Sequence, residues 1–135
     1  MTADAILLII KKMKGKKKSK YQKIESRARN YYEKWRKTGS FSPALNETIC
    51  VTRLGWNHLI DPRKRRTKRQ KAIRLEALPL AKKLIETSTT YQEKRRDKGL
   101  EYYAFVAEIE GRRIKTVVSS KNGGKKVFLS VIVLR

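Results

Sequence analysis

Residues 102 to 134 alternate between apolar and polar side chains, and this alternation constrains the fold more than any other feature of the sequence. Successive side chains of a β-strand point to opposite faces of the sheet, so a period of two indicates strands with one buried face. Two hairpin-turn sequences interrupt the pattern, Glu110-Gly111 and Asn122-Gly123-Gly124. The segment is therefore predicted to form an antiparallel meander of three strands.

The same alternation predicts which residues face the core. The apolar face is predicted to contain Tyr103, Phe105, Ala107, Ile109, Ile114, Thr116, Val118, Val127, Leu129, Val131 and Val133. The opposite face is predicted to contain Glu108, Arg113, Lys115, Ser119, Lys126, Phe128 and Ser130. Because most of this second set is polar or basic, we expect that face to stay exposed.

Helical signals precede the meander. Ser19 followed by Gln22 is a capping-box pattern that predicts the start of a helix, which continues until Gly39. Its apolar and aromatic positions recur at helical spacing: Tyr21, Ile24, Ala28, Tyr31, Tyr32 and Trp35. Such regular spacing is what burial of one helix face requires, so docking on the domain is favoured over stacking with nucleic-acid bases.

Shorter elements are predicted in the middle of the chain. Residues 40 to 46 have the Ser, Pro and Asn content of a loop, residues 48 to 52 resemble a short strand, and residues 55 to 60 form a helical turn that ends at Asp61-Pro62. A further helix should begin near Thr67, which forms a second capping-box pattern, and should be kinked or split at Pro79.

Together these patterns predict an α+β fold in which N-terminal helices pack on one face of a C-terminal antiparallel β-meander. A chain of 135 residues is large enough for one core, so residues 19 to 135 are expected to form a single domain. Residues 11 to 20, KKMKGKKKSK, repel one another, so residues 1 to 18 are expected to be a flexible basic arm.

The net charge indicates the class of partner. The chain carries 35 Lys and Arg against 12 Asp and Glu, a formal charge of +23. Such an excess opposes compaction unless a polyanion neutralises it, which favours nucleic acid. An anionic membrane surface is the main alternative, but the basic clusters recur along most of the chain.

Membrane insertion is not expected. The early apolar run, residues 5 to 10, is far shorter than the roughly 20 residues needed to cross a bilayer. Its lysines follow it, whereas a signal peptide places them before. We therefore expect no signal peptide, no transmembrane segment and a cytoplasmic site of action.

The densest basic run is RKRRTKRQK, residues 63 to 71, which contains no acidic residue. A phosphate-contacting surface is favoured over a merely solvated helix entrance. The candidate nucleic-acid-binding residues are Arg63, Lys64, Arg65, Arg66, Lys68 and Arg69 from this run, with Lys126 and Phe128 from the sheet.

Metal-free cleavage of RNA through its own 2′-hydroxyl needs a base, an acid and cations for the phosphate. The candidate catalytic residues are His58, Lys115, Arg113, Ser130 and Glu108. His58, the single histidine, has a structural role at its helical turn as the alternative, and Glu108 has an ordinary cross-strand ion pair. No acidic cluster suits a divalent metal, so no metal or other cofactor is expected.

The order of parts resembles the barnase, EndoU, colicin and RelE-like ribonuclease superfamily, including phage and polymorphic-toxin nucleases. The resemblance covers roughly residues 45 to 134 and rests on the GWNHLI turn followed by KRRDKGLEYYAFVAEIEGRRIKTVVSSKNGGKKVFLSVIVL. It implies an exposed sheet face that cuts RNA without metal, and restraint by an immunity protein or antitoxin.

By this resemblance the site falls on His58, Arg113, Lys115 and Ser130. EndoU-like members carry two histidines and this chain has one, so the second proton-transfer group must be Glu108, Lys115 or Tyr103, or catalysis is absent.

Two functions remain open at this point. The first is a metal-independent endoribonuclease, a toxin domain acting on tRNA, mRNA or rRNA and restrained by an acidic immunity protein or antitoxin. The second is a non-catalytic RNA- or DNA-binding protein, associated with the ribosome or the nucleoid, in which the same groups only contact phosphates.

Overall fold

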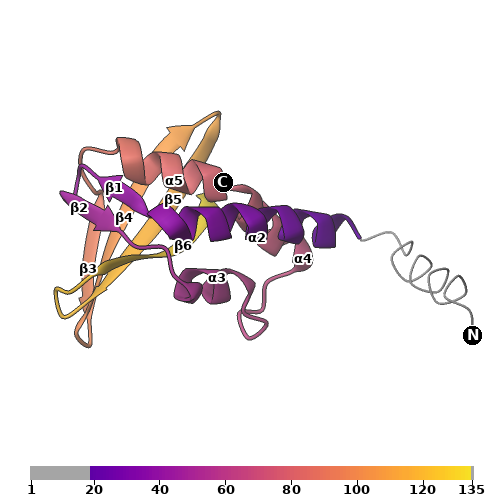
Figure 1. Ribbon diagram of the computed structural model, residues 1–135, viewed down its shortest axis with the longest axis horizontal. Helices are drawn as coiled ribbons and strands as arrows, with labels where there is room; N and C mark the ends of the chain where they lie inside the picture. The colour runs from indigo at the N-terminus through magenta and orange to yellow at the C-terminus, as the bar shows by residue number, and fades with distance from the viewer. Residues whose placement is uncertain (1–18, 135) are drawn as a thin grey trace, which may run out of the picture.

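The computed structural model describes residues 19–134, and these form the predicted α+β fold, in which helices precede an antiparallel sheet (Figure 1). The sheet has four strands, one more than the predicted meander. The elements in chain order are α2 (Lys20–Thr38), β1 (Ser40–Ser42), β2 (Glu47–Ile49), α3 (Arg53–Ile60), α4 (Lys68–Glu76), α5 (Leu78–Thr87), β3 (Glu93–Asp97), β4 (Leu100–Ile109), β5 (Arg112–Lys121) and β6 (Lys126–Leu134). The predicted basic arm, residues 1–18, lies outside the described residues.

Helix α2 begins and ends where the sequence predicts. The side chains of Ser19 and Gln22 form a reciprocal capping box, and Gly39 ends the helix with a φ of 61°. The apolar stripe packs on the domain, with its most buried residues being Ile24, Ala28, Tyr32 and Trp35. The prediction that this stripe docks on the domain is confirmed.

Local sequence signals also explain where the next three helices begin. The Thr52 side chain accepts a hydrogen bond from the Leu54 N–H and so starts α3 two residues before the predicted helical turn. Thr67 begins α4 with the predicted capping box. Pro79 lies in the first turn of α5 and separates it from α4, as expected of a residue that cannot continue a helix. None of the helices within residues 19–134 is long and apolar enough to cross a bilayer.

Two strands escaped prediction. β1 was predicted to be a loop, but its three residues pair with β2, which overlaps the beginning of the strand expected at residues 48–52. β3, with the sequence EKRRD, forms the edge of the main sheet, whose order is β3-β4-β5-β6. All five β3 side chains are exposed, so the strand has no apolar alternation to detect. Charged side chains are typical of an edge that must not pair with another chain.

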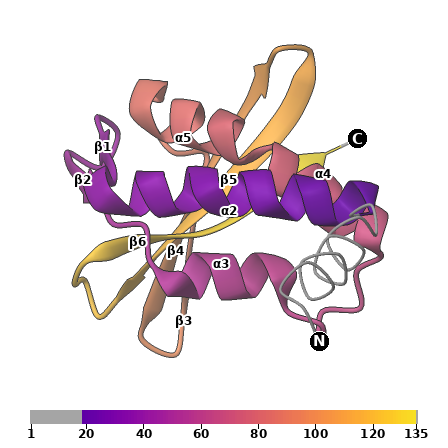
Figure 2. The same cartoon turned by 45° about the vertical axis from the view of Figure 1, so that its right-hand side comes forward.

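The helices cover one face of the sheet, called here the inner face (Figures 1 and 2). On β4 and β5 the prediction of this face is correct. Phe105, Ile114, Thr116 and Val118 are fully buried there. On β6 the register shifts by one residue: Val118 pairs with Phe128, whereas Val117 pairs with Ser130. Leu129 is therefore the extra residue of a β-bulge.

This bulge overturns the assignment of two residues to the exposed face. Phe128 is completely buried on the inner face, so it cannot contact nucleic acid. Lys126 is half-buried, forms an ion pair with Glu47 and lies 5.6 Å from the centre of the Tyr103 ring. The prediction failed because strict alternation was carried through a strand that contains one additional residue.

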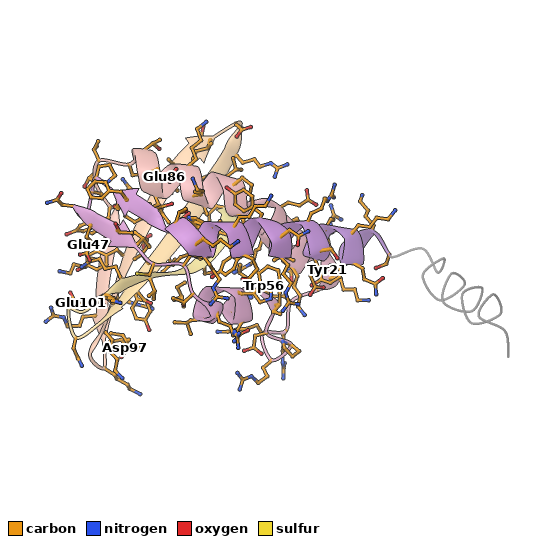
Figure 3. The ribbon with its side chains drawn as sticks, viewed as in Figure 1. Tyr21, Glu47, Trp56, Glu86, Asp97 and Glu101 are labelled. Atoms are coloured by element: carbon orange, nitrogen blue, oxygen red, sulfur yellow. The ribbon has the colours of Figure 1, made fainter. Side chains whose placement is uncertain are left out.

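An aromatic cluster joins α2 and α3 to the inner face. The Tyr32 ring lies 5.5 Å from the Trp56 ring, which Figure 3 shows beneath α2, and the Trp35 ring lies 4.9 Å from that of Phe128. Gly55 makes this approach possible, since a Cβ there would lie 2.7 Å from the Phe128 carbonyl oxygen. This contact places the end of α3, and with it His58, beside β6.

Candidate functional site

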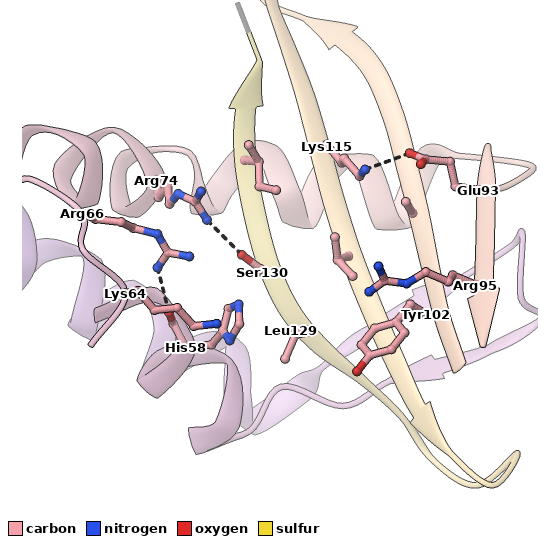
Figure 4. Close-up of a pocket in the computed structure, with 13 residues that line it drawn as sticks. His58, Lys64, Arg66, Arg74, Glu93, Arg95, Tyr102, Lys115, Leu129 and Ser130 are labelled. Atoms are coloured by element: carbon pink, nitrogen blue, oxygen red, sulfur yellow. Dashed lines mark hydrogen bonds and ion pairs between the residues drawn. The ribbon is translucent and has the colours of Figure 1, made fainter. Parts of the chain in front are cut away.

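The outer face of the sheet, on the side away from α2 and α5, holds a cavity of about 480 Å³ (Figure 4). The end of α3, the α3–α4 loop and α4 form one wall, and strands β3 to β6 form the rest. The lining residues are His58, Lys64, Arg66, Arg74, Glu93, Arg95, Tyr102, Ala104, Lys115, Val117, Leu129, Ser130 and Ile132.

Three of the five predicted catalytic residues meet in this cavity. His58 comes from α3, Lys115 from β5 and Ser130 from β6, just after the bulge. The other two, Glu108 and Arg113, lie opposite each other in the β4–β5 register, and neither lines the cavity. Both are exposed, one pleat nearer the β4–β5 turn than Lys115. Residues that share a face can still lie at different places along the strands.

Only part of the basic run, residues 63 to 71, reaches the cavity. Lys64 and Arg66 line the cavity, whereas Arg63, Arg65, Lys68 and Arg69 are exposed outside it. The Arg66 Nη1 donates hydrogen bonds to the carbonyl oxygens of His58, at 2.9 Å, and Leu59, at 3.3 Å. Arg66 thereby satisfies free carbonyls at the end of α3 and holds the loop against that helix. The same contact brings Lys64 to the mouth of the cavity beside His58, as Figure 4 shows.

Two further cations reach the cavity that sequence reasoning missed. Arg74 extends from α4, and its Nη1 donates to Ser130 Oγ at 3.4 Å. Burial, followed by the charge of Arg66, lowers the pKa of Arg74 to about 10, so it stays protonated at neutral pH. Arg95 extends from β3, with its guanidinium 4.8 Å from the centre of the Tyr102 ring.

Some of these residues could have been found in the sequence. Lys98 and Gly99 both adopt positive φ in the turn before β4, and a Lys-Gly pair ahead of an alternating segment is a hairpin signal that would have located β3. Tyr102 lies on the outer face by the same alternation that places Tyr103 on the inner face. Arg74 had no such signal, because only the packing of α4 against β6 directs it to the cavity.

The cavity is strongly cationic. Its lining includes five cations, Lys64, Arg66, Arg74, Arg95 and Lys115, and one carboxylate, Glu93, so four positive charges remain in excess. The carboxylate of Glu93 forms an ion pair with Lys115 at 2.9 Å. Guanidinium and ammonium groups converging in this way suit the oxygens of a phosphate.

His58 is the proton-transfer candidate of the cavity. Burial lowers the pKa of His58, and the charges of Lys64, Arg66 and Arg74 lower it further, against a smaller opposing effect of Asp61. A lowered pKa keeps the imidazole neutral at pH 7, the form that accepts a proton. Within residues 19–134 no hydrogen bond holds the imidazole, so the packing contacts of a structural histidine are present without its polar ones.

The arrangement can therefore hold a phosphate among cations and move a proton beside it. Arg74 and Ser130 are hydrogen-bonded at edge strand β6, and Lys115 lies on the neighbouring strand β5 of the same face (Figure 4). Ala104, Val117 and Leu129 supply an apolar floor between these groups. No protein-family model, characterised protein or solved structure matches this chain, and a function for the cavity is therefore inferred from its residues alone.

Proposed function

We propose that this protein is a metal-independent endoribonuclease that cleaves RNA by attack of the 2′-hydroxyl on the adjacent phosphate. The observation that carries the proposal is the position of the single histidine, His58, in a cavity lined by five cations. In this reaction the 2′-oxygen bonds to phosphorus, the bond from phosphorus to the 5′-oxygen breaks, and a 2′,3′-cyclic phosphate forms. One proton leaves the 2′-hydroxyl and one is delivered to the departing oxygen.

The cavity residues are assigned the following roles in this cleavage reaction. His58 accepts the proton of the 2′-hydroxyl, because its lowered pKa leaves it unprotonated at neutral pH. Arg66 and Arg74 stabilise the charge that develops on the phosphate oxygens. The departing oxygen takes its proton from Lys115.

The positions of the candidate proton donors favour Lys115 as the group that protonates the departing oxygen. The sequence offered Glu108, Lys115 or Tyr103. Glu108 lies outside the cavity, and Tyr103 is buried on the inner face, 5.1 Å from the Tyr91 ring. Lys115 lines the cavity with its side chain 27% exposed, so a substrate can reach it.

A toxin role belongs to the same proposal. The elements that form one wall of the cavity, the α3–α4 loop and α4, also carry exposed cations that would attract tRNA, mRNA or rRNA: Arg63, Arg65, Lys68 and Arg69. They would equally attract an acidic immunity protein or antitoxin that covers the cavity, because opposite surface charges accelerate association.

The second candidate is a non-catalytic RNA- or DNA-binding protein. Two observations favour it: Lys115 is already paired with Glu93, and His58 is the sole imidazole of the chain. If the cations serve only to grip phosphates, substitutions in the cavity will change affinity and leave no rate to lose.

Incubation of the purified protein with total RNA and a chelator separates the two. The proposal predicts discrete fragments that end in 2′,3′-cyclic phosphate, and His58→Ala should slow their formation by about 10²- to 10⁴-fold with little loss of RNA affinity. Intact RNA with a retarded gel band would establish the binding protein instead. Thermal unfolding of His58→Ala is the control: if the variant melts early and its folded fraction cleaves normally, the histidine is structural.

A further inference from the structure

A second cavity, of about 620 Å³, lies beside the first and meets it at His58 and Lys64, which line both. Its character is different. Leu54, Ile60 and Pro62 make much of its wall apolar, and Asn57 adds a side-chain amide. The ionisable side chains of His58, Asp61, Arg63 and Lys64 complete the lining. Apolar surface combined with a few polar groups is typical of a small-molecule site, and the volume lies within the usual range of about 300–1,000 Å³.

Helix geometry explains how this lining arises. Leu54, Asn57 and His58 stand at positions i, i+3 and i+4 of α3, which lie together on one face of a helix. The opposite face of α3 carries Trp56 and Leu59, both buried in the core. The exposed face of α3 therefore presents an apolar residue and an amide directly beside the proposed base of the reaction.

Two observations indicate that the exposed face of α3 is available to bind a ligand. Leu54 is 53% exposed, one of two large apolar side chains left so open among residues 19–134; Phe41, at 54%, is the other. The amide of Asn57 forms no hydrogen bond with any described residue. By contrast, both carboxylate oxygens of the neighbouring Asp61 are engaged by the guanidinium of Arg63, each at 3.1 Å. The side chain of Asn57 is exposed and, like those of His58 and Lys64, is free to bond to a ligand.

We infer that this second cavity binds the base of the nucleotide next to the scissile phosphate and prefers adenine. The inference rests on the proposed function, since a phosphate held in the first cavity places the attached nucleotide across His58. A base offers two apolar faces, which match Leu54, and a polar edge, which matches Asn57. On the edge that carries N7, adenine presents an amino donor beside a ring-nitrogen acceptor, the pair that an asparagine amide satisfies with two hydrogen bonds. On the same edge guanine presents two acceptors and cytosine only a donor, so a preference for adenine implies that Asn57 contacts this edge.

Binding to oligonucleotides that cannot be cleaved tests the inference apart from catalysis. The probes are deoxyuridine hexamers with one central adenine, cytosine or guanine, which lack the attacking 2′-hydroxyl. The hexamer with adenine should bind roughly tenfold more tightly than the others. Asn57→Ala should remove this preference while retaining affinity for the deoxyuridine hexamer. Asn57→Asp keeps the size and loses the donor, so it should also remove the preference, and its added negative charge should weaken binding of all four hexamers.

Leu54 provides the matched apolar test. Leu54→Ala should weaken binding of all hexamers several-fold, whereas Phe41→Ala, which truncates the other exposed apolar side chain on β1, should not. Equal affinity for all four hexamers, or an adenine preference that survives in both Asn57 variants, overturns the inference.

Hexamer binding and the RNA cleavage assay, measured on the same variants, separate this inference from the proposed function. If the protein prefers adenine through Asn57 but leaves RNA intact, the base site stands and the ribonuclease proposal fails. If the protein cleaves RNA with a base preference that is unchanged in Asn57→Ala, the ribonuclease stands and the base site is overturned.

Discussion

The two faces of the main sheet were built by different kinds of interaction. The inner face is a run of alternating apolar residues closed over by α2, α3 and α5, and its centre is fully buried. The outer face takes its functional groups from four strands, one loop and two helices, and it is cationic. Stability therefore resides on one face and the proposed chemistry on the other, so a substitution on either face should change one measured property and spare the other.

The two faces meet at the bulge in β6. There Phe128 enters the aromatic cluster while Leu129 and Ser130 both line the cavity. Without the extra residue, strict alternation would put Phe128 in the cavity and Leu129 in the core. The bulge thus decides which neighbour serves packing and which serves the site.

The largest expected effect concerns the core at this bulge. Phe128→Ala should lower the free energy of unfolding by about 3–5 kcal/mol, because the ring is fully buried against Tyr32 and Trp35. Leu129→Ala, one residue away and half-buried, should cost about 1–2 kcal/mol. Urea unfolding of both variants measures the difference. A larger loss for Leu129→Ala would show that the register of β6 is wrong.

The next effect lies on the outer face and compares two cations of β5. Lys115→Ala should lower the rate of RNA cleavage by about 10²-fold, the scale for losing a group that acts in the transition state. Arg113→Ala removes the same charge from the same face but outside the cavity, so its rate should stay within a few-fold of wild type. Single-turnover cleavage at saturating protein gives both values. Equal losses would mean that the cavity is not the reaction site.

The pH profile should report the cations around His58. Because burial and neighbouring positive charges lower the pKa of His58, kcat/KM should fall only below the ordinary histidine value of 6.5, about tenfold for each further pH unit. Lys64→Ser removes one of those charges, so the pKa rises and the acid limb moves to higher pH. Arg65→Ser, an exposed neighbour outside the cavity, should leave the limb in place. A limb that stays fixed in Lys64→Ser would exclude His58 as the base.

The smallest expected effect is a gain in RNA affinity. Glu93→Gln should raise RNA affinity about two- to fivefold at low salt, since it frees Lys115 from a pair whose carboxylate is 56% exposed and therefore weakly held. Glu108→Gln also removes one negative charge from the outer face, but outside the cavity, and should change affinity less. Fluorescence titration with a labelled RNA measures both. An equal gain in the two variants would show that only overall charge matters.

Local patterns in the sequence were sufficient for much of the fold. Both capping boxes, the end of α2 at Gly39 and the division of α4 from α5 at Pro79 depend on residues within one turn of the boundary. The inner face of β4 and β5 follows from alternation within each strand. β3 is the exception, because an edge strand with charged side chains has no such pattern.

The sequence by itself determined the fold class, the two ends of α2, the start of α4 and the break at Pro79. It also placed His58, Lys115 and Ser130 in a set of candidates, because all of these follow from neighbours along the chain and from residue chemistry. Only the tertiary structure decided that those three share a cavity, that Arg113 and Glu108 lie outside it, and that Phe128 is in the core. The physical reason is that such decisions depend on contacts distant in sequence. Arg74 reaches Ser130 across 56 residues, and the β6 bulge is matched to an aromatic cluster drawn from α2 and α3.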